Sequence, residues 1–124
     1  MNLAIETSSL VSSVAVGDEN NLKGELTIQG GLTHSEQLVP HIDDLLKKVG
    51  VCKKELSSIV VSIGPGSFTG LRIGLATAKA MAYGLDIPMV GIPTPEGIAY
   101  NALYADRLIA VLLDAQKKNV YATL

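Results

Sequence analysis

The sequence predicts an α/β fold: one mixed sheet of five strands with helices flanking it. Three extended segments come first and are joined by short turns, which is typical of an antiparallel meander. Strand and helix patterns then alternate, and a helix that crosses between two strands implies that those strands run parallel. The sheet therefore combines an antiparallel meander with parallel strands.

The meander is expected to occupy residues 1–6, 11–16 and 22–29, with a polar turn at residues 18–21. A helix over 34–49 follows. Thr33 and Glu36 form a capping-box pattern at its start. Its apolar residues recur at steps of four, three and four, which marks one face of a helix; they are Leu38, Ile42, Leu45 and Val49.

The second half of the chain predicts a strand over 58–63, a helix over 70–84 and a strand over 89–92. Thr94 is the expected N-cap of a third helix, because Pro95 suits the first helical position. Strand patterns at 108–113 and 120–124 then predict a hairpin. We expect residues 1–106 to form one lobe and residues 107–124 to begin a second, truncated one.

Composition limits the classes of function. Hydrophobic residues make up 48% of the chain and charged residues 18%, which suits a folded domain. The formal net charge of -2 argues against a chain that binds nucleic acid unaided. Cys52 is the single cysteine, so no internal disulfide can form. No signal-peptide pattern or membrane-spanning run is present, and we expect a cytoplasmic protein.

The glycine-rich run at residues 63–74 joins a buried-strand pattern to a helix start, which is the arrangement of an anion site. It does not match a Walker loop, because Leu71 stands where that motif requires lysine. It does not match a dinucleotide fingerprint either, because Thr69 replaces the third glycine. The alternative is a tight turn that lets the helix pack close to the sheet.

A second candidate turn follows the first strand. Glu6, Thr7 and Ser8 resemble the first phosphate turn of actin-like ATPases, where an acid positions metal-bound water. A capped hairpin turn is the alternative. Arg72 could hold a phosphate or pair with Glu6. The candidate phosphate-loop residues, which we regard as vestigial, are Glu6, Thr7, Ser8, Gly64, Gly66, Ser67 and Arg72.

We expect no metal site. Asp114 ends a later strand as Glu6 ends the first, but no basic loop accompanies this pair of acids. His34 and His41 are seven residues apart, and two helical turns separate them too far for a shared metal ion.

The helix over 70–84 is apolar nearly all round, which indicates that it is covered on more than one side. Its small residues would let another helix approach closely. A partner-binding face and a face covered by a missing half of the chain are both open. The candidate partner or dimer interface comprises His34, Leu38, His41, Ile42, Leu45, Leu71, Leu75, Ala78, Lys79, Met81 and Ala82.

Four motifs together resemble the TsaB (YeaZ) family. They are residues 5–8 (IETS), 34–40 (HSEQLVP), 64–74 (GPGSFTGLRIG) and 113–115 (LDA) followed by Val120 and Tyr121. The likeness extends over the whole chain, although family members usually run to about twice this length. Glu6 departs from the aspartate that the family usually has. The His-x-x-x-His pair of the catalytic sister protein is absent from the sequence.

The resemblance implies the first lobe of an actin/Hsp70-like (ASKHA) fold and a non-catalytic subunit. Such a subunit binds the catalytic TsaD protein through two helices, which here are residues 34–49 and 70–84, and can pair with itself through the same surface. A TsaE-type ATPase joins the complex, which transfers a threonylcarbamoyl group to the adenosine beside the tRNA anticodon. ATP and magnesium belong to the partners, and tRNA is contacted only through the complex.

An enzyme is the alternative function. An actin-like ATPase or phosphotransferase would use the Glu6–Thr7 turn and the loop at residues 64–67. In that case the chain would bind nucleotide by itself, and weak nucleotide binding therefore stays an open alternative to a chain with no cofactor of its own.

Overall fold

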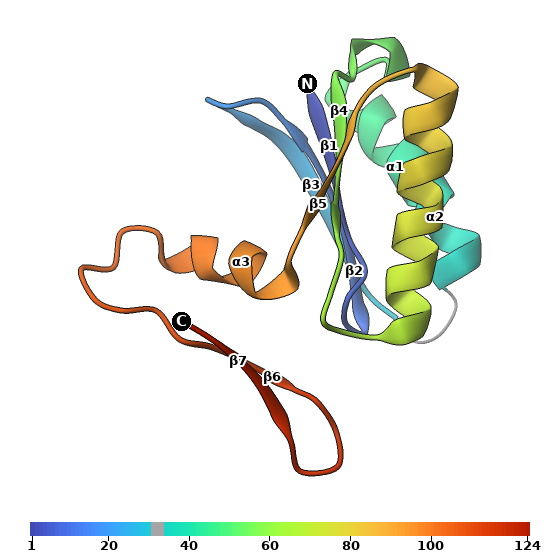
Figure 1. Cartoon of the computed structure of the whole chain (residues 1–124). Helices are drawn as coiled ribbons and strands as arrows, with labels where there is room; N and C mark the ends of the chain where they lie inside the picture. The colour runs from blue at the N-terminus through green and yellow to red at the C-terminus, as the bar shows by residue number, and fades with distance from the viewer. Residues whose placement is uncertain (31–33) are drawn as a thin grey trace.

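Five strands form one mixed sheet in this computed structural model, which describes residues 1–30 and 34–124. The strands are β1 (Asn2–Glu6), β2 (Val11–Gly17), β3 (Leu22–Gln29), β4 (Ser58–Ser62) and β5 (Met89–Ile92). Their order is β3-β2-β1-β4-β5, with β1 at the centre (Figure 1).

The pairing directions confirm the predicted mixed sheet. β1 pairs antiparallel with β2, and β2 pairs antiparallel with β3. β1 pairs parallel with β4, and β4 pairs parallel with β5. Asn2 lies opposite both Gly17 and Ser58, so the first strand joins the meander to the parallel half. The arrangement is that of an actin/Hsp70-like lobe.

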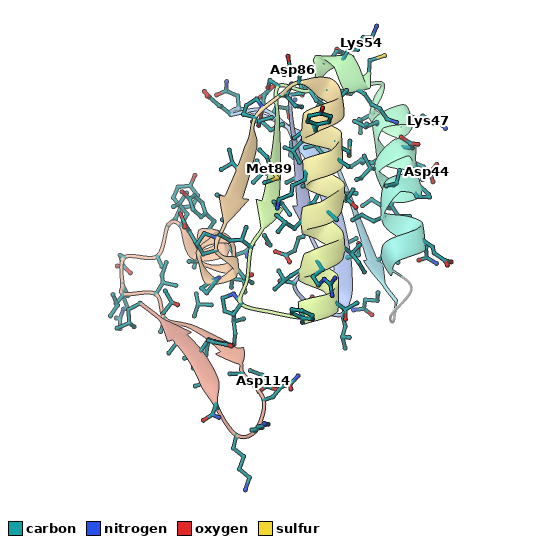
Figure 2. The ribbon with its side chains drawn as sticks, turned by 45° about the vertical axis from the view of Figure 1, so that its right-hand side comes forward. Asp44, Lys47, Lys54, Asp86, Met89 and Asp114 are labelled. Carbon is teal, nitrogen blue, oxygen red and sulfur yellow. The ribbon has the colours of Figure 1, made fainter. Side chains whose placement is uncertain are left out.

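Two long helices cover one face of this sheet. α1 (His34–Val49) and α2 (Phe68–Leu85) pack side by side there, and α3 (Thr94–Ala99) lies away from them across the sheet (Figures 1 and 2). The described residues include two short 3₁₀ turns, η1 (Lys53–Glu55) and η2 (Tyr100–Ala102). The described part of the chain contains no helix that is long and apolar enough to cross a membrane.

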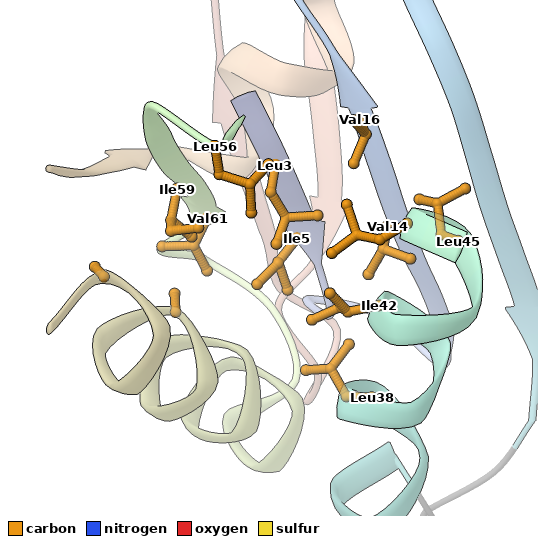
Figure 3. Packing of buried hydrophobic residues seen from close by; sticks show 13 residues of the cluster. Leu3, Ile5, Val14, Val16, Leu38, Ile42, Leu45, Leu56, Ile59 and Val61 are labelled. Carbon is orange, nitrogen blue, oxygen red and sulfur yellow. The ribbon is translucent and has the colours of Figure 1, made fainter. Parts of the chain in front are cut away.

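The core lies between the sheet and α1 and α2. Alternate residues of β1 and β2 point to this side, because successive side chains of a strand face opposite ways. The apolar side chains in Figure 3 come from both the strands and the helices and fill this layer. The largest of them that are fully buried are Leu3, Ile5, Val14, Val16, Leu38, Ile42, Ile59 and Val61.

A separate hairpin ends the chain. β6 (Val111–Asp114) and β7 (Val120–Thr123) form their own two-stranded sheet below α3 in Figure 1. Val111 is buried, whereas every residue of β7 is exposed. The turn between the strands holds Gln116, Lys117 and Lys118 at positive φ angles of 62°, 50° and 64°. These are left-handed conformations that residues other than glycine seldom adopt.

Several element boundaries differ from those expected. β4 ends at Ser62, α2 begins at Phe68, and β6 begins at Val111. Thr94 is not the N-cap of α3. Pro93 holds that position, and Thr94 is the first helical residue. The predicted capping box at Thr33 falls outside the described residues.

Candidate functional site

The two candidate turns meet at one edge of the sheet. Parallel neighbours such as β1 and β4 end at the same edge, so the turn after Glu6 lies beside the loop after Ser62. That loop runs into α2, whose N-cap is Ser67. The fold therefore brings together two of the predicted segments, residues 6–8 and residues 64–67.

Glycines of the loop and of α2 rest directly on the first turn. A Cβ atom added at Gly66 would overlap the carbonyl oxygen of Ser8. A Cβ added at Gly70 would overlap the carbonyl oxygen of Thr7, and one added at Gly74 would overlap the Thr7 hydroxyl. The absence of side chains at these positions lets the loop and the start of α2 pack against the turn that follows β1, as one of the two sequence interpretations expects.

Hydrogen bonds fix this close packing. The Thr7 hydroxyl donates to the carbonyl oxygen of Gly70 at 2.7 Å, and the Ser67 N–H donates to the carbonyl oxygen of Ser8 at 2.6 Å. The Gly70 N–H in turn donates to the Ser67 hydroxyl at 3.2 Å. Thr7 is 0% exposed, so this network is closed to solvent at its centre.

These bonds occupy groups that an anion would need. Anions bind at helix N-termini through free backbone N–H groups. Here Ser67 caps the helix itself, and its own N–H is bonded to the first turn. The Gly70 N–H, another of the donors that a helix start leaves free, is bonded to the Ser67 hydroxyl. The arrangement joins a helix to a strand, and these donors at the helix start are thereby engaged within the chain.

Both carboxylate oxygens of Glu6 also have partners within the chain. The Ser8 N–H donates to Oε1 at 2.6 Å, and the Ser62 hydroxyl donates to Oε2. Glu6 therefore ties the end of β1 to the end of β4. The described residues contain no group of three His, Cys, Asp or Glu side chains that could hold a metal ion.

Pairing with Glu6 is one of the two options for Arg72, and the described residues do not show it. Arg72 is exposed, and its guanidinium carbon lies 5.3 Å from the ring centroid of Phe68. Glu6 alternates with Leu3 and Ile5, which are buried on the helix-covered side, and so points to the other side of the sheet. The ion pair found among the described residues is Lys53 with Asp43, at 2.6 Å.

The other acid considered with Glu6 lies in the hairpin. Asp114 Oδ1 accepts the N–H of Gln116 at 2.8 Å, and Figure 2 shows Asp114 in the hairpin, away from the five-stranded sheet. This local bond has the same form as the bond from the Ser8 N–H to Glu6. In both cases the acid ends a strand and accepts from the residue two positions later.

Sequence reasoning missed a groove on the face of the sheet that α1 and α2 leave uncovered. Its volume is about 550 Å³, and α3 and η2 form one wall. Small side chains of alternate strand positions form the floor, which is the signal that could have indicated it. The lining residues include Ala4, Glu6, Ala15, Glu25, Ser62, Glu96 and Tyr100.

The predicted interface residues differ in how exposed they are to solvent. Five of them are buried, and for these the predicted contact with a partner is wrong. A side chain buried in the core of its own chain cannot touch a partner. Leu38, for example, is 1% exposed. The five buried residues are Leu38, Ile42, Leu45, Ala78 and Ala82. Their stripes face the sheet and the neighbouring helix.

The remaining predicted interface residues are more accessible. Lys79 is exposed, and His41, Leu71, Leu75 and Met81 are partly exposed. Leu75 and Met81 also pack against the core. The side chain of His34 lies outside the part of the chain that the structure describes.

The outer face of α2 carries large exposed side chains that the sequence analysis did not select. Phe68 is 74% exposed and Tyr83 is 92% exposed. A shallow depression of about 350 Å³ lies at the start of the helix, lined by Phe68, Thr69, Arg72, Ile73 and Ala76. Helical spacing places Phe68, Arg72, Ala76, Lys79 and Tyr83 on one side, which we call the outer face of α2.

The family model and the curated relatives that match the chain carry different names, TsaD and TsaB, and both names refer to threonylcarbamoyl modification of adenosine in tRNA. The model of the family "TsaD: tRNA N6-adenosine threonylcarbamoyltransferase" matches residues 28–124. The chain is 37% identical over 122 residues to the tRNA threonylcarbamoyladenosine biosynthesis protein TsaB of Bacillus subtilis, covering 98% of this chain and 53% of that protein. It is 31% identical over 121 residues to the Escherichia coli protein of the same name, covering 96% and 52%.

A solved structure agrees with these sequence matches. YeaZ from Pseudomonas aeruginosa superposes with a TM-score of 0.85 at 30% sequence identity, over 98% of this chain and 57% of that one. The chain thus spans about half the length of the curated relatives it matches.

Proposed function

Because the chain belongs to the TsaB (YeaZ) family, we propose that the protein acts in tRNA threonylcarbamoyladenosine biosynthesis as a non-catalytic subunit that binds and stabilises TsaD. The contact with TsaD uses the exposed sides of α1 and α2. The observation that carries the proposal is the exposed outer face of α2, on a chain whose relatives are named for this pathway.

The character of the outer face supports a protein partner. It combines two exposed aromatic residues, Phe68 and Tyr83, with the small residue Ala76. Aromatic residues and arginine are enriched at protein interfaces, and small residues let a second helix approach. Arg72 and Lys79 add positive charge, so we expect the matching helices of TsaD to present carboxylates. Val39 of α1 is a further exposed apolar residue on the neighbouring helix.

The state of the glycine loop supports a non-catalytic role. Phosphate transfer needs free donors around the phosphate and an acid that can hold metal-bound water. Here the N–H groups of Ser67 and Gly70 and both oxygens of Glu6 have partners within the chain. No observation favours the ATPase alternative.

Co-elution tests the interface. TsaD is mixed with the wild-type chain or with an Ala76→Glu variant and passed over a size-exclusion column. Ala76 is exposed, so a glutamate there should change the surface without disturbing the core, unlike a change at Leu75. We expect wild type to co-elute with TsaD and the variant to elute separately.

The matched control is Ala105→Glu. Ala105 is also exposed, and its loop lies on the side of the molecule opposite α2 (Figure 1). This variant should co-elute as wild type does. Equal co-elution of Ala76→Glu and Ala105→Glu would refute the assignment of the surface, and failure of wild type to bind TsaD would refute the proposed function.

Calorimetry with Mg-ATP separates the scaffold from the enzyme. We expect no heat of binding and no phosphate release from the isolated chain. Micromolar binding together with turnover would support the ATPase alternative and contradict a non-catalytic subunit.

We propose the same surface for self-association. A second copy would compete with TsaD for the outer face of α2, so the molar mass of the isolated chain should fall to that of a monomer in Ala76→Glu. A TsaE-type ATPase would join only after TsaD has bound, and tRNA would be contacted through the assembled complex. These partners are inferred from the family.

We also propose that residues 107–124 begin a second lobe. The turn at Asp114 repeats the bond found at Glu6, in which an acid at a strand end accepts the N–H two residues later. Hydrogen exchange tests this idea. In a longer chain that supplies the rest of the lobe, amides of β7 should exchange more slowly than in the 124-residue chain.

A further inference from the structure

We propose that Thr7 is a positioning residue for partner binding: its side chain sets how α2 lies on the sheet, and thereby the position of the outer face of α2. The inference rests on the proposed function, because its measured quantity is the affinity for TsaD. It assigns a present role to a turn that resembles a phosphate loop but whose Thr7 hydroxyl and Glu6 carboxylate are bonded within the chain.

Thr7 contacts α2 at two glycines, where the helix presents its backbone and no side chain. Gly70 and Gly74 are both buried, and neither has room for a Cβ atom because of Thr7. The helix backbone therefore contacts Thr7 directly. Neither glycine has a side chain that could change its rotamer to relieve the contact. Close-packed contacts of this kind transmit a displacement instead of absorbing it.

The hydroxyl adds direction to this contact. It donates to the carbonyl oxygen of Gly70 at 2.7 Å, and Thr7 is fully buried. The glycine contacts limit how near the helix can come to the sheet. The hydrogen bond to Gly70 favours one rotation of α2 about its axis and one position of its first turns along that axis. A valine at position 7 would keep the shape of the side chain and lose this bond.

The same turns of α2 carry the outer face on their opposite side. Successive residues of a helix are rotated by about 100°, so Phe68, Arg72 and Ala76 point away from Gly70 and Gly74. These three residues line the depression at the start of α2. A shift of the backbone at Gly74 therefore moves the depression by a similar amount, and interfaces tolerate little such movement because their cores are packed as densely as protein interiors.

A size-swap experiment tests the proposal. Gly74→Ala places a methyl group against the Thr7 hydroxyl and should push α2 away from the sheet. Gly84→Ala is the matched control on the same helix, because nothing lies within 4 Å of a Cβ atom there. We expect Gly74→Ala to weaken TsaD binding by about tenfold or more and Gly84→Ala to change it by less than about twofold.

The double variant Thr7→Ala with Gly74→Ala provides the rescue. Removing the hydroxyl leaves the Cβ atom of residue 7 at 3.4 Å from the new methyl carbon, which is an ordinary contact distance. The double variant should bind TsaD within about threefold of Thr7→Ala alone, so the two changes should be far from additive. A purely structural loss of packing would instead make the double variant the weakest binder.

Affinities are measured by titration calorimetry at a temperature where circular dichroism shows every variant to be folded. Should Gly74→Ala fail to fold, the pair Thr7→Val and Thr7→Ser carries the test. Serine keeps the donor and should bind TsaD like wild type, whereas valine should bind more weakly. Wild-type binding with no loss in Gly74→Ala or in Thr7→Val would overturn the inference alone, and absence of wild-type binding would overturn the proposed function beneath it.

Discussion

Buried hydroxyl groups cost free energy when they have no hydrogen-bond partner, and two threonines of this chain differ in this respect. The Thr7 hydroxyl donates to Gly70, as described above. The Thr94 hydroxyl is equally buried but has no partner among the described residues, although the Thr94 N–H donates to the carbonyl oxygen of Gly64 at 2.8 Å. The two hydroxyls should therefore contribute oppositely to stability.

Thr7→Val should lower the free energy of unfolding by about 1–3 kcal/mol, because it removes a buried hydrogen bond without changing the shape of the side chain. Thr69→Val, at an exposed threonine of the same helix start, should change it by less than about 0.5 kcal/mol. Urea denaturation followed by circular dichroism gives both values. Equal effects at the two positions would contradict the importance of the Thr7 bond.

Thr94→Val should leave the free energy of unfolding unchanged or raise it by up to about 1 kcal/mol, because it removes a buried polar group that lacks a partner. The same denaturation experiment measures it. A loss of stability as large as that of Thr7→Val would mean that the Thr94 hydroxyl is bonded in solution.

At the scale of elements, α1 shows what an apolar pattern can and cannot predict. The spacing of Leu38, Ile42 and Leu45 correctly predicts one buried face over the observed helix. Spacing does not tell which surface covers that face. We expected a partner, but the sheet and α2 cover it, since contacts between residues far apart in sequence leave no periodic signal within one helix.

Leu38→Ala and Val39→Ala test this correction at neighbouring positions of α1. Leu38 is buried, and its truncation leaves a cavity that should cost about 2–5 kcal/mol of unfolding free energy. Val39 is 47% exposed, and its truncation should cost less than about 0.5 kcal/mol. Thermal or urea unfolding of the two variants measures the difference, and similar costs would contradict the assignment of Leu38 to the buried face of α1.

The glycines before and within the start of α2 allow two interpretations from sequence, for a physical reason. Gly66, Gly70 and Gly74 suit both a phosphate cradle and a close approach of helix to strand, because both need backbone without side chains. The position of Thr7 and Ser8 against these glycines distinguishes the two interpretations and favours the close approach. That position depends on the pairing of β1 with β4. Pairing of Arg72 with Glu6 could not be judged from the sequence either, because the two residues come from segments far apart along the chain, and Glu6 points to the side of the sheet that α2 does not cover.

At the scale of the whole molecule, strand directions and the mixed sheet could be predicted from the order of the patterns, while the uncovered groove could not. The small residues Ala4 and Ala15 form its floor, and its wall comes from α3 and η2, nearly a hundred residues further along the chain. The hairpin β6–β7 touches the rest mainly through α3, and each of its strands has four residues.

A chain that ends at residue 106 should therefore keep the stability of the five-stranded unit. Isolated two-stranded hairpins are marginal in water and contribute little to a neighbouring core. We expect core amides such as those of Leu3, Val14 and Ile59 to show unchanged protection in native-state hydrogen exchange. A general loss of protection in the shortened chain would mean that the hairpin is part of the same cooperative unit.

The parallel pairing of β1 with β4 has a consequence for biosynthesis. Asn2 pairs with Ser58, so the ribosome must make more than fifty further residues before the central strand gains its second neighbour. Until then β1 is an open edge of the nascent meander in addition to β3, and such edges invite aggregation. Chaperones that bind extended apolar segments would have their best opportunity during that interval.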